Sequence, residues 1–206
     1  MAKQVISNAD MGGKSLVVIR EIAGKREMKR TIVLVMLFQL VAFTTAFALI
    51  HEGMQAPEFT VMSGDGIEMT LWKLSGTVTT IFYETKDKDI IEKNRALKNE
   101  VNLFYSGQTD SMKKLISRIA IVDCRKASWP LTGLWKSKLV ENSKKEGIMI
   151  YGDWDGMFAK NYNIMDGETN FLVIDKKGAV RYSKAGQIDK NEIYKIKALL
   201  AKLLEE

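Results

Sequence analysis

An uncharged run, Thr31 to Ile50, divides this chain of 206 residues into two unequal parts. The residues KREMKR come directly before it, and its most apolar part, Ile32 to Val41, spans about ten residues. That length is typical of the hydrophobic core of a signal peptide, whereas a membrane-spanning helix needs about 20 apolar residues. The run closes with Ala46-Phe47-Ala48, a small-x-small pattern of the kind that signal peptidase cleaves. We therefore predict a signal peptide over residues 28–48 and an exported protein that begins at Leu49.

The N-terminal region leaves two alternatives open. The signal peptide could begin at Met28, with residues 1–27 as an upstream extension, or residues 1–27 could form an unusually long n-region. If residues 28–48 are retained, they form a single-pass anchor whose basic side stays in the cytoplasm. Both interpretations place residues 49–206 outside the cytoplasm, in the bacterial periplasm or another extracytoplasmic compartment. We expect contact with the membrane only through this segment.

The formal net charge of +6 is concentrated near the N-terminus. Residues 1–48 carry seven basic and three acidic residues, which leaves 24 basic and 22 acidic residues in the remaining chain. These remaining charges are interspersed, whereas a nucleic-acid-binding surface needs a basic stripe. We predict no nucleic-acid partner.

The chain has one cysteine, Cys124, and one histidine, His51. One thiol cannot form an intramolecular disulfide or a Cys-x-x-Cys redox pair. One cysteine and one histidine are also too few for a zinc site, and a single histidine leaves little basis for a Ser-His-Asp triad. We predict no cofactor.

Short strand-like segments alternate with helical ones after residue 58. The predicted strands are residues 59–62, 67–71, 78–83, 119–122, 148–151, 171–174 and 179–182. Helical spacing is found over residues 86–104, around residues 134–140 in a second amphipathic helix, in a turn at 156–163, and after Asp189, which begins a capping box. This order predicts one α/β domain over residues 49–206, with a central mixed β-sheet flanked by helices and an appended N-terminal β-hairpin.

Two segments carry a resemblance to the thioredoxin-like proteins. Ala56-Pro57-Glu58-Phe59, followed by Leu71 to Gly76 and the strand VTTIFY, resembles the entry of extracytoplasmic thiol–disulfide and peroxiredoxin-type domains. Residues 171–189, FLVIDKKGAVRYSKAGQID, resemble their closing hairpin and the start of the last helix. The resemblance covers nearly all of residues 55–206 and implies a thioredoxin-like fold.

The redox residues of those proteins are missing. Where they carry Cys-x-x-Cys at the start of a helix, this chain has Glu84 to Asp89, without sulfur. Where they carry a cis-proline before the closing hairpin, this chain has Thr169. The motifs around Gly76, Trp154 and the VIDKKG…KAGQID ending resemble more narrowly the YtfJ family of exported proteins, which implies the fold without the redox pair. That family supplies no catalytic residues to carry over.

Cys124 is the only candidate catalytic residue. It follows a predicted buried strand and precedes Arg125 and Lys126, two cations that would favour a thiolate. This is the basis of an alternative function, a one-cysteine peroxidase or another thiol-dependent enzyme. The sequence around Cys124 lacks the peroxiredoxin context and offers no resolving thiol, so a strand-end cysteine without a chemical role is the simpler interpretation.

Two further groups could form a binding site. Asp153 and Asp155, with Asp166 and Glu168, could bind a hard cation such as Ca²⁺, although their spacing is not that of an EF-hand and aspartates are common in turns. Four aromatic residues could line a groove for a ligand or partner: Trp129, Trp135, Tyr151 and Trp154.

We therefore expect a non-catalytic extracytoplasmic module that binds a protein or a small ligand. A membrane-tethered accessory subunit is the corresponding expectation if the apolar segment is retained.

Overall fold

The computed structural model describes residues 49–84 and 92–206. The predicted signal peptide at 28–48 and the segment 1–27 lie outside these ranges. Within them, no helix has the length and apolar character needed to cross a membrane.

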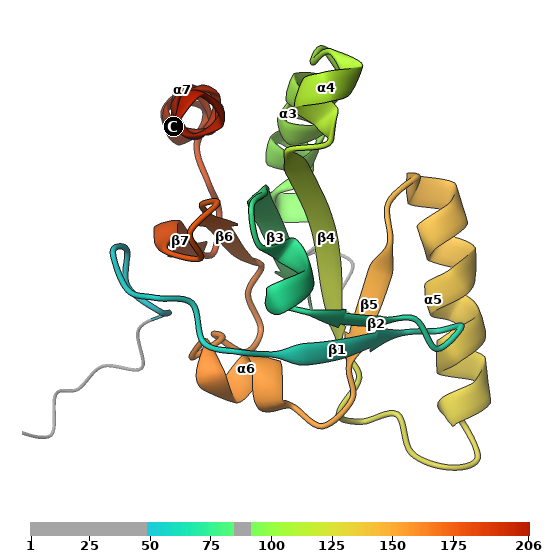
Figure 1. Cartoon of the computed structure of the whole chain (residues 1–206). Coiled ribbons are helices and arrows are strands. Elements are labelled where there is room, and N and C mark those ends of the chain that lie inside the picture. Colours follow the sequence, from blue (N-terminus) through green and yellow to red (C-terminus); the bar gives the residue numbers. More distant parts are fainter. Residues whose placement is uncertain (1–48, 85–91) are drawn as a thin grey trace, which may run out of the picture. The chain divides into compact units, whose positions relative to one another are not determined.

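The described strands form one mixed sheet in the order β2-β1-β5-β4-β3-β6-β7 (Figure 1). Their bounds are β1 Thr60–Ser63, β2 Glu68–Thr70, β3 Val78–Glu84, β4 Ile116–Asp123, β5 Ile150–Asp153, β6 Asn170–Ile174 and β7 Val180–Ala185. β4 pairs in parallel with both β3 and β5, while the remaining pairs are antiparallel. The β1–β2 hairpin joins the sheet through β5, so the predicted mixed sheet with an appended N-terminal hairpin is confirmed.

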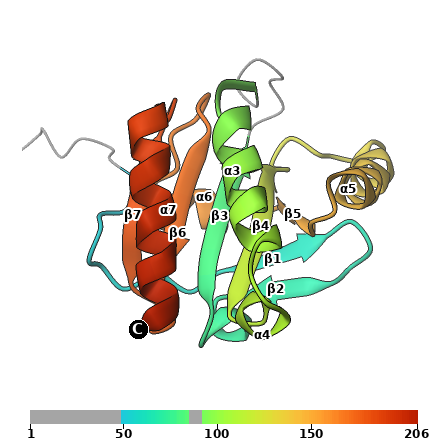
Figure 2. The same ribbon diagram turned by 90° about the horizontal axis from the view of Figure 1, so that it is seen from above.

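Helices cover both faces of this sheet. Their bounds are the 3-10 helix η1 Trp72–Leu74, α3 Arg95–Ser106, α4 Asp110–Lys113, α5 Thr132–Glu146, α6 Met157–Asn161 and α7 Lys190–Glu205. Figure 1 shows α3 and α7 on one side of the central strands and α6 on the other. In Figure 2, α3 and α7 are seen from the side while α5 is seen end-on, so α5 runs across the direction of the other two helices.

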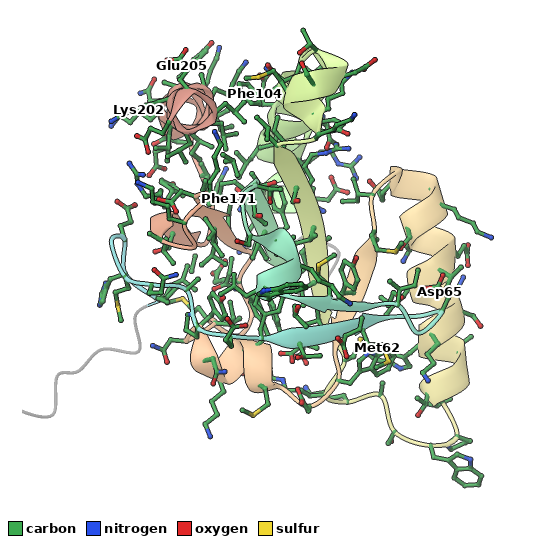
Figure 3. All side chains as sticks on the ribbon, in the orientation of Figure 1. Met62, Asp65, Phe104, Phe171, Lys202 and Glu205 are labelled. Atoms are coloured by element: carbon green, nitrogen blue, oxygen red, sulfur yellow. The ribbon has the colours of Figure 1, made fainter. Side chains whose placement is uncertain are left out.

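Alternating side chains of β3 supply both layers of the core. Val78 and Phe82 pack with residues of α3 and α7, while Ile81 and Tyr83 pack with α6 and the hairpin. Phe171 of β6 belongs to the α7 layer, where Figure 3 shows it below that helix. The period of two in an extended chain dictates this division.

The last helix forms as the sequence predicts. The Asp189 carboxylate accepts a hydrogen bond from the Glu192 N–H at 2.9 Å, and the Glu192 carboxylate accepts one from the Asp189 N–H at 3.3 Å. These two bonds complete the capping box. Ile193, Ile196 and Leu200 are buried against α3 and β3, so the helix packs across one face of the sheet.

Four local predictions need correction. β4 begins at Ile116, earlier than the predicted strand at 119–122. β5 begins at Ile150 instead of residue 148. α5 buries only Leu139, and Leu134 is 60% exposed, because α5 stands partly clear of the sheet. The predicted helix at 86–104 is interrupted at Asn94: residues 92–93 are helical and α3 begins at Arg95, while Ile90 lies outside the described residues.

The segment before the hairpin belongs to the core. Leu49 and Ile50 are both buried, and the Ile50 N–H donates a hydrogen bond to the Tyr162 carbonyl at 3.0 Å. The Gly53 N–H donates to the Val180 carbonyl at 2.7 Å, which places this segment along the edge of β7. The described part of the chain is therefore tied into the fold from its first residues.

Candidate functional site: a groove between α3 and α5

The end of β3 is the place where the fold would position a redox dithiol. Glu84 occupies it, with a carboxylate that is 8% exposed and forms an ion pair with the Lys98 ammonium of α3. The Lys98 ammonium also lies 5.8 Å from the centre of the Phe82 ring. Residues 85–91, which include most of the predicted replacement for the Cys-x-x-Cys motif, lie outside the described residues.

Hydrogen bonds of Asn94 and Thr169 connect the loops next to the end of β3. The side chain of Asn94 donates to the Gly186 carbonyl at 2.7 Å and accepts from the Ile188 N–H at 2.9 Å. Thr169, at the position of the family's proline, is fully buried, and its carbonyl accepts from the Gly186 N–H at 2.8 Å. The described residues here hold carboxylate, ammonium, amide and hydroxyl groups, and no sulfur.

Cys124 lies directly after the neighbouring strand, β4, whose Val122 pairs with Glu84 of β3. Its side chain is 1% exposed and packs with Ala120, Leu139 and Ile150. The Arg125 guanidinium, a predicted activator of the thiol, forms ion pairs of 2.7 Å with carboxylates on each side. The structure therefore places Cys124 in a packed core cluster and directs the charge of Arg125 toward carboxylates.

Asp153 is a buried structural carboxylate. It is 0% exposed, and its Oδ2 accepts hydrogen bonds from the Tyr83 hydroxyl at 3.1 Å and the Ala159 N–H at 2.9 Å. Its Oδ1 accepts from the Phe158 N–H at 3.3 Å. Burial raises the pKa of Asp153, and these three hydrogen bonds oppose that rise. The carboxylate thus connects the ends of β3 and β5 to the start of α6.

The other acidic residues of the predicted cation site each bond to a different partner. Asp155 accepts a hydrogen bond from the Met157 N–H at 3.0 Å. Asp166 pairs with Arg125, and Glu168 pairs with Lys93 at 3.4 Å. Among the described residues, no group of three or more His, Cys, Asp or Glu side chains is arranged to hold a metal ion.

The four predicted aromatic residues are divided among different environments. Tyr151 is buried in the core beneath α6. The indole N–H of Trp154 donates to the Met62 carbonyl at 2.9 Å. Trp129 is 89% exposed in the loop before α5. Only Trp135 lines a groove, the one described next.

A groove of about 570 Å³ lies between α3 and α5, over β3, β4 and β5. Its volume is within the range of about 300–1,000 Å³ that small-molecule sites occupy. Six apolar residues form most of its floor: Phe82, Ala120, Val122, Trp135, Leu139 and Ile150. Charged residues surround them, among them Glu84, Lys98, Arg118, Lys138, Lys145 and Glu146. An apolar floor with a few polar groups around it is the usual form of a ligand site.

The most unusual polar group in the groove is the guanidinium of Arg118. It projects from β4 on the same face as Ala120 and Val122. Its Nη1 donates to Asn102 Oδ1 at 2.5 Å, and its central carbon lies 3.8 Å from the centre of the Tyr105 ring. Both contacts come from α3, so they hold the guanidinium plane in one orientation.

Sequence reasoning missed Arg118 because the predicted strand began three residues too late. With the strand extended to Ile116, the alternation Ile116, Arg118, Ala120, Val122 shows a cation among inward-facing residues. A cation at an inward-facing position of a strand was the sequence feature that could have indicated Arg118 as a site residue.

These features define a thioredoxin-like protein in which the place of the redox dithiol carries no cysteine. Similar solved structures include a candidate protein disulfide isomerase from Bacteroides thetaiotaomicron, with TM-score 0.58, 20% identity, and coverage of 76% of this chain and 92% of that one. A thiol peroxidase from Chromobacterium violaceum has TM-score 0.55, 19% identity, and coverage of 75% and 88%. The pneumococcal exposed lipoprotein thioredoxin of Streptococcus pneumoniae has TM-score 0.53, 16% identity, and coverage of 70% and 100%.

At these identities the similarity shows the fold, which confirms the predicted thioredoxin-like class. Residues 62–203 match the family described as "bacterial protein of unknown function (YtfJ_HI0045)". The chain therefore belongs to the YtfJ family, as its motifs predict. No curated protein is significantly similar to it in sequence.

Proposed function

We propose that this protein is an exported thioredoxin-fold module that binds a ligand in the groove between α3 and α5 and does not exchange disulfides. The observation that carries the proposal is the groove itself, with its apolar floor and its half-buried guanidinium. The burial of the only cysteine in the sequence, Cys124, supports the non-redox part, because exchange needs an attacking thiolate at an accessible position.

Export is the second part of the proposal. The signal-peptide pattern of residues 28–48 supports it, and so does the existence of an exposed lipoprotein among the structural neighbours. Cleavage after Ala48 would leave Leu49 and Ile50 in the exported chain, where both are core residues. N-terminal sequencing of the protein from the extracytoplasmic fraction tests this part, with Leu49 as the expected first residue. Retention of residues 28–48 would establish the anchored form.

Ligand binding in the groove can be measured with an uncharged fluorescent probe, N-phenyl-1-naphthylamine. Its fluorescence rises when it moves from water into an apolar site, so the purified protein should give a saturable increase. Val122→Phe puts a larger side chain on the groove floor and should weaken binding roughly tenfold, or about 1.4 kcal/mol, because its ring occupies volume that the probe would fill.

The matched control is Leu103→Phe, which adds a similar ring on a part of α3 that is exposed and does not line the groove. It should leave probe binding within about twofold of the original protein. Absence of saturable binding, or equal binding by the two variants, contradicts the groove as the ligand site.

A further inference from the structure

We infer that the groove recognises an aliphatic monocarboxylate, whose carboxylate pairs with Arg118 and whose hydrocarbon chain covers the apolar floor. The inference rests on the proposed function, since it assigns a ligand class to the same groove.

The first observation is that none of the carboxylates in the described part of the chain neutralises the charge of Arg118. Within residues 49–84 and 92–206, its guanidinium forms no ion pair with a carboxylate, and its partners are the amide oxygen of Asn102 and the side chain of Tyr105. Other arginines of the described chain are treated differently: Arg125 pairs with two carboxylates, and so does Arg181. An anionic ligand would give Arg118 the carboxylate partner that Arg125 and Arg181 already have within the protein.

The second observation is that the guanidinium is partly withdrawn from water. Burial lowers the pKa of Arg118, which means that the surroundings stabilise its charged form less well than water does. A carboxylate in the groove would restore that stabilisation through charge-assisted hydrogen bonds. The contacts with Asn102 and Tyr105 already fix the guanidinium, so little side-chain entropy would be lost on binding.

The third observation concerns the rest of the ligand. Beside Arg118 on β4 come Ala120 and Val122, and α5 contributes Trp135 and Leu139 to the same groove. This surface offers contact to a hydrocarbon chain and few hydrogen-bond partners for a polar one. The carboxylates near the groove are partly engaged already, since Glu84 pairs with Lys98. One anchored negative charge with an apolar tail therefore fits the groove better than a ligand with several charges.

The test is calorimetric titration of the protein, purified after expression of the full chain, with octanoate, 1-octanol and octylammonium at neutral pH. The three probes share a chain length and differ in head-group charge. Octanoate should bind at least tenfold more tightly than either of the others. Arg118→Met, which keeps an unbranched apolar stem, should weaken octanoate binding roughly 10- to 100-fold, the range expected for a lost hydrogen bond between charged groups. Arg118→Lys should retain part of the affinity.

Binding of N-phenyl-1-naphthylamine separates this inference from the proposed function. In Arg118→Met it should stay within about twofold of the original protein, which also shows that the groove remains folded. Arg181→Met, in an ion-pair network outside the groove, is the matched control and should leave octanoate binding unchanged. If the uncharged probe binds but octanoate and 1-octanol bind equally, only the carboxylate assignment is wrong. If neither probe binds, the groove is not a ligand site.

Discussion

The hydroxyl of Tyr83 donates a hydrogen bond of 3.1 Å to the carboxylate of Asp153, and both residues are buried at the ends of their strands. Tyr83 is the last residue but one of β3, and Asp153 is the last residue of β5. The hydrogen bond therefore crosses the intervening strand β4. Burial raises the pKa of Tyr83, with the Asp153 charge as the next cause. The hydroxyl therefore stays protonated and remains a donor to the carboxylate.

This relationship predicts opposite outcomes for two similar substitutions. Tyr83→Phe should lower the free energy of unfolding by about 1–3 kcal/mol, because it leaves a buried carboxylate without one donor. Tyr182→Phe should be neutral or slightly stabilising, because the Tyr182 hydroxyl is buried without a hydrogen-bond partner among the described residues. Urea unfolding of the two variants checks the pair. Equal changes in the two variants would contradict a stabilising role for the Tyr83–Asp153 hydrogen bond.

The Asp123–Arg125 pair predicts a dependence of stability on pH. Hydrogen bonds from the Arg125 guanidinium hold the pKa of Asp123 below its usual range. A depressed pKa stabilises the folded protein above the unfolded pKa of about 3.9, and this contribution is lost as the pH falls through the folded pKa. Because Arg125 is partly exposed, Arg125→Met should cost only about 1 kcal/mol at neutral pH.

Arg125→Met should be about as stable as the original protein in acid. As the pH falls through the depressed pKa of Asp123 in the folded original protein, this carboxylate becomes protonated and the two unfolding free energies should converge. Unfolding measured over a pH series gives the difference directly. A difference that stays constant down to the acid range would assign the effect of Arg125 to packing and not to charge.

Gly152 of β5 is predicted to tolerate no side chain. A Cβ at this position would lie 2.6 Å from the Trp154 ring and 2.9 Å from the Cys124 Sγ. Gly152→Ala should therefore cost about 1–3 kcal/mol. Gly133→Ala in α5, where a Cβ would meet no atom within 4 Å, should be neutral or stabilising by up to about 1 kcal/mol. Thermal unfolding of the two variants decides this, and equal melting temperatures would contradict the packing around Cys124.

The N-terminal segment is predicted to be part of the stable domain. A chain that begins at His51 lacks Leu49 and Ile50, which are both buried in the core. Relative to a chain that begins at Leu49, it should lose roughly 3 kcal/mol or more of unfolding free energy, since each buried aliphatic side chain contributes about 1.5–3 kcal/mol. Guanidinium unfolding of the two chains measures the loss. Equal stability would mean that the segment is dispensable.

Much of the fold could be predicted from local patterns. The capping box at Asp189 and the apolar spacing after it specify α7, and the turn at residues 175–178 specifies the last hairpin. The groove could not be predicted in the same way. It depends on how far α5 stands from α3, a tertiary property, and Leu134 shows the consequence because its apolar side chain remains exposed. The orientation of Arg118 depends likewise on Asn102 and Tyr105, two residues of another element.

The burial of Cys124 depends on tertiary packing in the same way. The sequence predicts a strand-end cysteine, and the structure adds that the thiol is buried among Ala120, Leu139 and Ile150. Neither a count of cysteines nor a motif search reports burial, because burial is set by the packing of β4, α5 and β5 together.

The central claim is that this thioredoxin fold works without dithiol chemistry, and reduction of insulin disulfides in the presence of dithiothreitol tests it most directly. The only thiol, Cys124, is 1% exposed and lies directly after β4, the strand next to β3, instead of at the end of β3 itself. Without a second thiol in the chain, a mixed disulfide could not be resolved within the protein. The folded protein should therefore reduce insulin at the rate of the buffer control, and Cys124→Ser should give the same rate. Catalysis above that control, abolished by Cys124→Ser, would contradict the account and favour a thiol-dependent enzyme.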